Sequence, residues 1–492
     1  MPSSRTPVLV GVAAVQQREE DPDLAAEPLE LMGRALEAAA EDAGSRELLS
    51  RADSIRAPRG FWGYSDPCRL LAHRFGAAAA RTEVAEVGVL QTTLLGRAAR
   101  DIAEGAADVV LLSGGEARHR VARATASGRE ASMTLQEGLT PDSVLRPTAE
   151  IVTQAEIRAH LGRPVNQYAL IENALRAAEG QKLPEHRRDV AELWAGFSRV
   201  AAANPDAWAR EELTAAQIGE PGPGNRMLAF PYTKRLVSQW NVDQAAGLVL
   251  CSLETARRLG LPESRYVYPL AVVDSEHMLP LTRRRDLHRA PGFALAAERV
   301  FDISGGALGD VSRMELYSCF PAAVRVQQRE LGVAPEQEVT ITGGMTFGGG
   351  PLNNFVLQSW VRMAELLRED GGGTGLVTAV SGIITKQGVT LFSTERGDGF
   401  VFDDVTAAAA AASSEVEVVD AGEGPARVAT YTVLYDNERP ARTILLCDLE
   451  DGRRAIAIAE DPELAEWATR EELCGAGVDL SADGSVTWRG RS

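Results

Sequence analysis

The chain contains 492 residues, of which 45% are hydrophobic, and it carries a formal net charge of −18 with an isoelectric point near 5.0. This length suits about three domains, and the hydrophobic fraction is large enough for extensive buried cores. The acidic balance excludes a general nucleic-acid binder, because such a protein needs a basic surface to neutralise phosphates.

The N-terminal residues alternate between patterns that are typical of strands and of helices. Val8–Val15 is a short apolar run that predicts a buried strand. Apolar residues repeat along one side of Pro28–Asp42 and of Val87–Glu104, which predicts two helices. Asp108–Gly115 then predicts a second buried strand. Alternation of this kind indicates a layered α/β unit with some parallel sheet, which we assign to residues 1–117.

Residues 118–240 differ in composition, with many Arg, Asn and Pro residues, and they predict an inserted loop domain that covers one edge of the α/β core. Its expected helices are Ala149–Leu161, Asn166–Ala178 and Arg187–Asn204. Residues 241–265 return to the earlier pattern, with a strand and a short helix, and complete the first half of the core.

Residues 266–405 follow the same order of strands and helices, which predicts a second half of similar architecture. The two sequences are not visibly repeated, so this duplication is inferred from the pattern alone. The expected helices are Phe293–Phe301, Pro321–Leu331 and Pro351–Arg368, and the expected strands are Tyr266–Asp274, Arg313–Leu316, Glu338–Ile341, Gly375–Ser381 and Val389–Ser393.

Residues 406–492 begin with an alanine-rich linker and continue with β-favouring segments separated by turn dipeptides such as Asp451-Gly452. Five short strands and one helix, Glu463–Glu472, predict a small all-β domain that resembles the oligonucleotide/oligosaccharide-binding barrel. The name of that fold does not imply nucleic-acid binding.

Metal ligands and membrane spans are not apparent in the sequence. The five cysteines include no Cys-x-x-Cys pair, and none of the six histidines has the spacing of a metal-ligand pair. We therefore expect no metal and no required cofactor. Sparse cysteines suit a reducing cytosol, and no apolar run approaches the roughly 18 residues that span a bilayer. The expectation is a cytoplasmic protein without a membrane span.

Four segments carry a resemblance to a known family. Leu316-Tyr-Ser-Cys-Phe320 resembles a His-Asp-Cys-Phe element, and Gly349-Gly-Pro-Leu352 resembles a Gly-His-Pro-Leu element. Residues 90–116 resemble the helix after a nucleophile and the strand that follows it, and residues 385–393 resemble a last core strand. Over residues 7–395 the chain resembles the thiolase superfamily, most closely the sterol-carrier-protein-type thiolases and acetyl-CoA acetyltransferase-like proteins. The resemblance implies two similar αβαβα halves with an inserted loop domain.

The resemblance also implies where the catalytic groups of a thiolase would stand. The nucleophilic cysteine, the histidine, the second cysteine and the Asn or His of the fourth loop fall, in that order, at Gly88, Gly350, Val380 or Ser381, and Tyr317. Thiolase chemistry needs a thiolate that accepts the acyl group and groups that move protons. Glycine supplies neither, so we expect a degenerate active site without ordinary Claisen condensation or thiolysis.

Two side chains near the fourth loop are candidates for chemistry. Tyr317 is a candidate proton donor or oxyanion partner, and the alternative is a buried aromatic residue at the end of a strand. Cys319 precedes a predicted helix whose N-terminal dipole would lower the pKa of the thiol, which makes it a candidate nucleophile. The alternative is a small core residue, the usual role of a free cysteine.

The glycine-rich turn that follows is a candidate site for the thioester oxygen, because backbone N–H groups at a helix start can bind an anion. The residues concerned are Gly343, Gly344, Gly348 and Gly349. The alternative is a flexible turn in a degenerate relative. Lys386 is interpreted as a solvated surface lysine rather than as a contact to an anion.

Together the residues and the resemblance predict a thiolase-like protein of the acyltransferase family that binds or acts on acyl-CoA thioesters in lipid metabolism. Some thiolase relatives that pair with such a β-domain cleave acyl-CoA side chains by retro-aldol chemistry, and Tyr317 stands where an acid–base tyrosine would help. The alternative is a non-catalytic CoA- or lipid-binding protein or scaffold. A dinucleotide-binding enzyme is a weaker alternative, because no acidic ribose partner follows the glycine-rich turn. The resemblance also suggests a homodimer.

Overall fold

The computed structural model describes residues 4–419, 422–481 and 484–489 of the chain. Its first sheet contains β1 (Pro7–Gln16), β2 (Ser54–Pro58), β3 (Arg81–Ala85), β4 (Val109–Ala117), β5 (Ser143–Leu145) and β8 (Asp243–Ser252). The strands lie in the order β1-β8-β4-β2-β3-β5, with β8 antiparallel to both of its neighbours and the β4-β2-β3-β5 part parallel.

The second sheet contains β9 (Tyr268–Ser275), β10 (Arg313–Glu315), β11 (Thr374–Ser381), β12 (Lys386–Ser393) and β13 (Val401–Asp404). Its order is β10-β11-β12-β9-β13, and β12 is antiparallel to β11 and to β9. Each half of the chain thus supplies one mixed sheet, as the pattern of strands and helices predicted.

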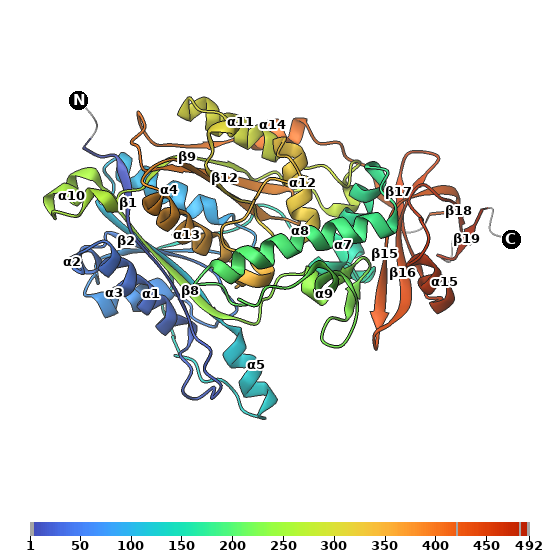
Figure 1. Cartoon of the computed structure of the whole chain (residues 1–492), viewed down its shortest axis with the longest axis horizontal. Coiled ribbons are helices and arrows are strands. Elements are labelled where there is room, and N and C mark those ends of the chain that lie inside the picture. The colour runs from blue at the N-terminus through green and yellow to red at the C-terminus, as the bar shows by residue number, and fades with distance from the viewer. Residues whose placement is uncertain (1–3, 420–421, 482–483, 490–492) are drawn as a thin grey trace.

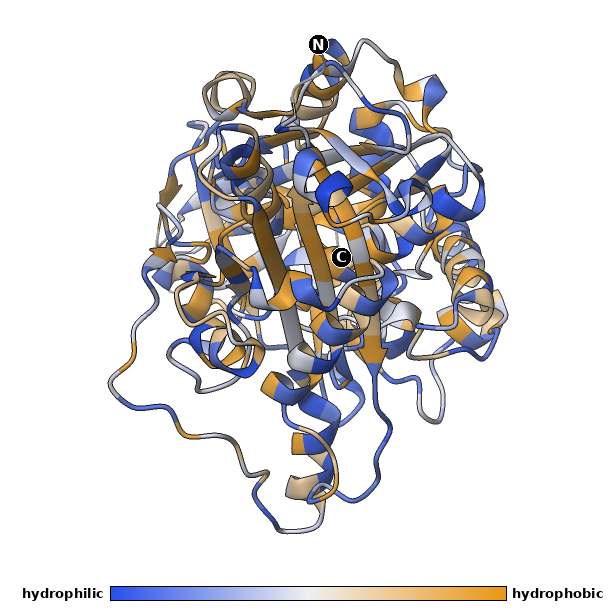
Figure 2. Ribbon diagram, turned by 90° about the vertical axis from the view of Figure 1, so that its left-hand side faces the viewer, coloured by the Kyte–Doolittle hydropathy of each residue, from blue (hydrophilic) through white to orange (hydrophobic). Residues whose placement is uncertain are grey.

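Helices fill the space between the two sheets and cover their outer faces (Figure 1). The middle layer holds α4 (Gln91–Ala103) and α13 (Phe355–Glu369), whose buried side chains share one core with residues of both sheets. The outer helices are α1 (Pro28–Asp42), α2 (Glu47–Ser50), α3 (Pro67–Phe75) and α10 (Leu253–Arg258) on the first half, and α11 (Gly292–Ser304) and α12 (Pro321–Leu331) on the second. Figure 2 shows predominantly hydrophobic strands at the centre, with helices of mixed character around them. The predicted layered α/β fold is confirmed.

A close approach of backbone to backbone fixes α1 on the first sheet. An ideal Cβ atom on Gly247 would lie 2.5 Å from the carbonyl carbon and oxygen of Ala35, and one on Gly11 would lie 2.0 Å from the carbonyl oxygen of Ala39. Only glycine fits at both positions, because any side chain would meet the helix backbone. The helix therefore packs directly on the strands and buries its apolar side.

The inserted region contains α5 (Arg118–Ala126), α6 (Gln154–Arg158), α7 (Pro164–Ala178), α8 (Leu183–Ala203), α9 (Ala215–Gly219), β6 (Met227–Ala229) and β7 (Tyr232–Thr233). The helix expected over Ala149–Leu161 is wrong in length, since only α6 forms there. Thr153 caps that helix with its side chain and His160 ends it with a φ of +59°. A left-handed residue cannot continue a helix.

The C-terminal region forms a third sheet of β14 (Val418–Val419), β15 (Gly424–Asp436), β16 (Arg439–Leu449), β17 (Arg454–Ala459), β18 (Gly477–Leu480) and β19 (Val486–Trp488), with α14 (Thr406–Ala411) before it and α15 (Pro462–Ala468) within it. The order is β14-β17-β16-β15-β18-β19, and β6 of the insertion pairs with β15. This added β region is confirmed, with more strands than the sequence predicted.

The third sheet packs on α7 of the inserted region. The hydroxyl of Thr430 donates to the carbonyl of Leu170, and the amide of Asn173 donates to the carbonyl of Tyr431. Arg176, fully buried, forms an ion pair with Glu472. These contacts make the C-terminal region part of the same folded body.

Short 3-10 turns occupy Lys234–Leu236, Glu263–Arg265, Leu281–Arg283 and Leu308–Asp310. Within residues 4–419, 422–481 and 484–489, no helix is long and apolar enough to cross a membrane. The same part of the chain holds no group of three or more His, Cys, Asp or Glu side chains that could bind a metal ion.

Candidate functional site

Gly88, the residue expected at the position of a thiolase nucleophile, lies in the turn between β3 and α4. The helix expected from Val87 begins only at Gln91, because Gly88 has a φ of +104°, outside the helical region. An ideal Cβ atom on Gly88 would lie 3.0 Å from the Cβ atom of Pro147. The turn therefore favours glycine by both its backbone angle and its neighbours.

Lys386 reaches Gly88 from the first residue of β12. Its side chain is 2% exposed, and its ammonium group donates to the carbonyl oxygen of Gly88 at 2.7 Å and forms an ion pair with Glu276. The interpretation of Lys386 as a solvated surface lysine is wrong. The reason is that β12 is buried over its whole length, so a lysine there must find partners inside the protein.

The end of β11, before the turn to β12, carries Val380 and Ser381, the residues expected near a second cysteine. Val380 is buried, and Ser381 is the last residue of β11. An ideal Cβ atom on Gly382 would lie 3.2 Å from the side chain of Lys386. The structure thus brings this turn and the turn of Gly88 together, with Lys386 between them.

Tyr317 follows β10 and is partly buried. Its ring packs edge-on against Phe355 with centroids 5.9 Å apart, and its N–H donates to the hydroxyl of Thr378. Burial raises the pKa of the Tyr317 phenol above its usual value of 10.0, and the neighbouring Cys319 adds to the shift. The phenol makes no hydrogen bond to any residue in the described ranges. The phenol is therefore protonated, and its O–H group donates to no side chain or carbonyl in the described part of the chain.

Cys319 lies at the end of the same loop, two residues before α12. Burial raises the pKa of the Cys319 thiol to about 12, although the hydroxyl of Tyr168 lies beside it and acts in the opposite direction. The net lowering of this pKa that the sequence suggested does not occur, because desolvation of the thiolate outweighs the backbone N–H groups of Cys319 and Phe320, which lower it. Little thiolate is present at neutral pH.

The glycine-rich turn contains one turn of π-helix, Gly344–Gly348. The N–H groups of Gly343 and Gly344 donate to the hydroxyls of Thr340 and Thr342, respectively. An ideal Cβ atom on Gly343 would lie 2.3 Å from the Cβ atom of Ala201, so the turn packs tightly against α8. These two N–H groups therefore form hydrogen bonds within the turn segment itself.

Residues 348–350, the second part of the glycine-rich turn, are held by hydrogen bonds with residues 239 and 244. The carbonyl of Gly348 accepts from the amide of Gln244 at 3.0 Å, and Gly349 has a φ of +105°. The N–H of Gly350 donates to the carbonyl of Gln239, and the N–H of the preceding Ser238 donates to the carbonyl of Cys319. The segment 238–239 therefore joins the Gly350 turn to the loop that carries Cys319.

Glu315 anchors the chain that leads into this turn. Its buried carboxylate accepts from the N–H groups of Ile341 and Thr342 and from two threonine hydroxyls. Burial raises the pKa of Glu315 to about 7 despite these donors. The strand expected over Glu338–Ile341 does not form, and within that range the carboxylate takes the N–H of Ile341, which a neighbouring strand would need.

A group of exposed aromatic side chains, which sequence reasoning missed, lies beside the same segment. Trp240 directly follows Gln239 and is 47% exposed, and its ring centroid lies 5.7 Å from that of Phe61, which is 50% exposed. The guanidinium carbon of Arg118 lies 5.1 Å and 5.2 Å from the two ring centroids. No local signal could have joined these three residues, because they come from separate loops and a helix start.

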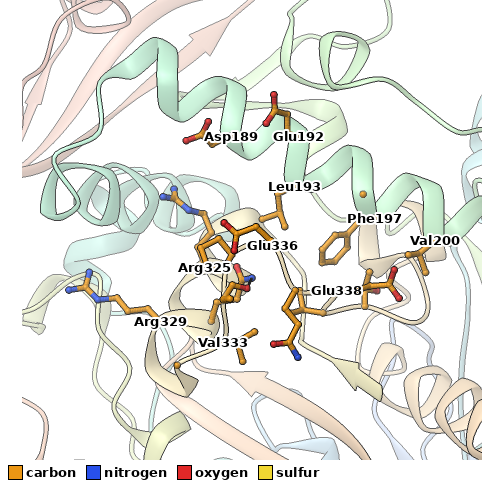
Figure 3. A pocket seen from close by; sticks show the side chains of 18 of the residues that line it. Asp189, Glu192, Leu193, Phe197, Val200, Arg325, Arg329, Val333, Glu336 and Glu338 are labelled. Carbon is orange, nitrogen blue, oxygen red and sulfur yellow. Dashed lines mark hydrogen bonds between the residues drawn. The ribbon is translucent and has the colours of Figure 1, made fainter. Parts of the chain in front are cut away.

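A cleft of about 970 Å³ opens between α8, the end of α12 and the loop 332–340 (Figure 3). Its lining includes Phe197, Leu193 and Val200 of α8, together with five carboxylates and three arginines. One of these arginines, Arg325, pairs with the buried Glu172. Neither Gly88 nor Tyr317 lines this cleft, and its acidic excess does not suit a polyphosphate.

Comparison with known proteins finds solved structures and a domain model that are similar to this chain. The crystal structure of a monomeric SCP2-thiolase-like protein type 1 from Mycobacterium smegmatis is 29% identical to the chain, covers 99% of both chains and has a TM-score of 0.83. Residues 406–485 match the family model of the thiolase-like protein type 1 additional C-terminal domain. The chain is a thiolase-like protein with an additional C-terminal domain.

More distant structures share the fold of this thiolase-like protein. An Ltp2-ChsH2(DUF35) aldolase is 18% identical, with a TM-score of 0.61 over 80% of this chain and 98% of that chain. Human mitochondrial 3-ketoacyl-CoA thiolase in complex with CoA is 15% identical, with a TM-score of 0.57 over 80% of this chain and 98% of that chain. No curated protein matches the chain. Because the mycobacterial protein is described as monomeric, the homodimer suggested by the resemblance is not supported.

Proposed function

We propose that this thiolase-like protein binds an acyl-CoA thioester without forming an acyl-enzyme. The observation that carries the proposal is the pair of Gly88 and Lys386. A residue without a side chain stands at the expected nucleophile position, and a buried ammonium group holds its carbonyl oxygen. The thiol of Cys319, two residues after Tyr317, has a pKa of about 12, which leaves it protonated.

The aromatic group supports CoA as the ligand. Trp240 and Phe61 offer exposed faces on which an adenine ring can stack, and Arg118 beside them can meet a phosphate. The segment 238–240 connects these side chains to Gly350 and Cys319. A nucleotide bound on these rings would direct its pantetheine arm toward Gly350 and Cys319. A thiolase of the same fold has been solved in complex with CoA.

Calorimetry with CoA and with butyryl-CoA tests this proposal. We expect saturable binding that weakens about tenfold or more in Trp240→Ala, since stacking of a base on an aromatic ring contributes about 1–3 kcal/mol. The matched control is Leu135→Ala, which removes another exposed apolar side chain, 89% exposed, outside this group. Intact-mass measurement after incubation with butyryl-CoA should show no added acyl group. Absence of CoA binding, or a stable acyl adduct, would refute the proposal.

A second candidate function is retro-aldol cleavage of a β-hydroxyacyl-CoA, and the free phenol of Tyr317 favours it. The phenol can donate its proton to the α-carbon as the bond between the α- and β-carbons breaks, and the phenolate so formed takes the proton of the β-hydroxyl, which restores the phenol. Burial, which raises the pKa of Tyr317, favours the donating half of that cycle. One structurally similar protein is an aldolase by name. The reaction needs no acyl-enzyme.

Product analysis separates this lyase from a non-catalytic binding protein or scaffold. A β-hydroxyacyl-CoA is incubated with the wild type and with Tyr317→Phe, and the carbonyl product is measured. Turnover that disappears in Tyr317→Phe while CoA binding persists supports the lyase. CoA binding without turnover in the wild type supports the non-catalytic alternative.

We also propose a cytoplasmic location, since all five cysteines are free. The proposed domain limits, which rest on the sequence pattern, are 1–117 with 241–265, 118–240, 266–405 and 406–492.

A further inference from the structure

A small cavity of about 90 Å³ lies at the N-terminus of α11, and neither Gly88 nor Tyr317 lines it. Its walls include Arg284, His277, Gln387, Gly292 and Thr385. The volume is about three times the share of one water molecule in the liquid. The cavity therefore suits a group of a few heavy atoms and is too small for CoA.

Arg284 brings a buried positive charge to this cavity without a carboxylate partner. The residue is 3% exposed, its Nε atom donates to the carbonyl of Leu279 and its Nη2 atom donates to the carbonyl of Gly382. The Nη1 atom has no hydrogen-bond partner in the described part of the chain. Burial lowers the pKa of Arg284 to about 10, and Tyr168 and then Glu156 act in the opposite direction. A buried guanidinium without a carboxylate partner is expected to bind an anion, because a buried charge without a counterion destabilises the folded state.

The remaining polar groups refine the chemistry of the occupant. Gly292 begins the 13-residue helix α11, and its N–H donates to no acceptor in the described residues. The amide nitrogen of Gln387 donates to the carbonyl of Ile384 at 2.8 Å, which fixes the amide and leaves its Oε1 atom as a buried acceptor without a partner. The Nε2 atom of His277 is also buried and unpartnered. An occupant must therefore accept from Arg284 and donate to Gln387.

Among the basic side chains that line the cavity in the described part of the chain, Arg284 is the charged one without an ion-pair partner. Arg289 forms an ion pair with Glu330, and burial lowers the pKa of His277 below its usual 6.5, so this histidine is neutral at physiological pH. The exposed Asp286 also lines the cavity and favours a singly charged anion over a doubly charged one.

We propose that the Arg284 cavity binds a small oxyanion of the hydrogen-phosphate type, one that keeps an O–H group. Its oxygens accept from the Nη1 atom of Arg284 and the N–H of Gly292, and its hydroxyl donates to the Oε1 atom of Gln387. Because Arg284 also holds the carbonyl of Gly382, the anion would stiffen the turn that leads to Lys386. This site is separate from the proposed CoA site and does not depend on it.

Thermal unfolding and calorimetry in potassium phosphate, potassium sulfate and potassium chloride at equal ionic strength test the site. We expect phosphate to bind saturably at neutral pH and sulfate to bind at least tenfold more weakly, because sulfate has no proton to give to Gln387. Arg284→Met should abolish the phosphate-specific stabilisation. The control Arg285→Met, which changes the adjacent exposed arginine, should keep it.

A second variant and a second ligand sharpen the result. Gln387→Met removes the acceptor, so phosphate and sulfate should then bind within about threefold of each other. Glycerol 3-phosphate distinguishes the source of the anion: binding equal to that of phosphate indicates a monoester, and weaker binding indicates the free ion. The proposal is overturned if phosphate stabilises the wild type no more than chloride does, or if Arg284→Met retains the phosphate effect.

Discussion

The ammonium group of Lys386 donates a 2.7 Å hydrogen bond to the carbonyl oxygen of Gly88, which lies 298 positions away in the chain. This bond joins the start of β12 in the second half to the turn before α4 in the first half. Glu276 supplies the opposite charge. A structural contact thus occupies the place to which the resemblance assigns the nucleophile, and it ties the two halves of the core together.

Replacing Lys386 with methionine is expected to lower the stability of the protein by about 1–3 kcal/mol, because the carbonyl of Gly88 loses its buried donor and Glu276 loses its counterion. Urea unfolding measures the loss. The matched control is Arg453→Met, which breaks an exposed ion pair with Asp451 and should leave stability unchanged. Equal unfolding midpoints for the wild type and Lys386→Met would show that the contact does not stabilise the fold.

Restoring a thiol with Gly88→Cys is expected to destabilise the protein by about 1–3 kcal/mol and to produce no thiolysis. A side chain at a φ of +104° is strained, and its Cβ atom would lie 3.0 Å from Pro147. No histidine stands at Gly350 to activate the thiol. Thermal unfolding and an acetoacetyl-CoA thiolysis assay provide the two measurements.

The control for this variant is Gly399→Ala, where a Cβ atom meets nothing within 4 Å and the φ is not in the left-handed region. It should unfold like the wild type. Thiolysis at ordinary thiolase rates in Gly88→Cys would mean that the residues around Gly88 still form a thiolase site, against the proposed absence of an acyl-enzyme.

Some elements of the fold were predictable because their ends carry local signals. Helix α12 begins with Pro321 at its first position and ends at Leu331, just before Gly332, whose φ is +71°. Proline at the start and glycine just after the end are strong helix boundaries in a sequence. Helix α1 likewise starts at Pro28 and matches its expected bounds. Periodic apolar residues between such signals suffice to place these helices.

The site was less predictable, because its geometry depends on residues far apart in the chain. Lys386 is buried with the rest of β12, and its partners Gly88 and Glu276 come from distant parts of the chain. Trp240 contacts Phe61 and Arg118, which are equally distant in the sequence. A pattern read along the sequence carries no information on such contacts. The positions of the Gly88 and Gly350 turns were predicted instead from the family resemblance.

Stability is expected to fall as the pH rises from about 4 to about 7. Burial raises the pKa of Asp274 from its usual 3.8 to about 7 and that of Glu315 from 4.5 to about 7. The folded state thus binds these protons more tightly than the unfolded state does. Their contribution to stability is complete below the unfolded pKa values and is lost as the carboxyls ionise. A tenfold difference in proton affinity between the two states corresponds to about 1.4 kcal/mol.

Asp274→Asn tests this origin of the pH dependence. The hydroxyls of Thr92 and Thr93 donate to the Asp274 carboxylate, at 2.5 Å and 2.7 Å, and can rotate to accept from an amide. The variant should therefore lose less stability between pH 5 and pH 8 than the wild type in urea unfolding. The exposed Asp451→Asn serves as the control and should keep the wild-type slope. An unchanged slope in Asp274→Asn would contradict the assignment.

Removal of residues 406–492 is expected to leave a chain that aggregates instead of a stable thiolase core. Ile444 and Leu446 of β16 are fully buried in the same core cluster as Leu170 of α7. Without them α7 exposes an apolar face, and Arg176 loses Glu472. An exposed apolar patch of this kind promotes association.

Size-exclusion chromatography and thermal unfolding of the truncated chain measure this effect. Arg176→Met is the milder companion variant, because it removes one interfacial ion pair and keeps the apolar contacts; it should elute like the full chain and unfold at a lower temperature. A truncated chain that elutes as a single compact species and unfolds at the wild-type temperature would show that the core is independent of the C-terminal sheet. Since β6 of the insertion pairs with β15, that outcome would also require the insertion to fold without its partner strand.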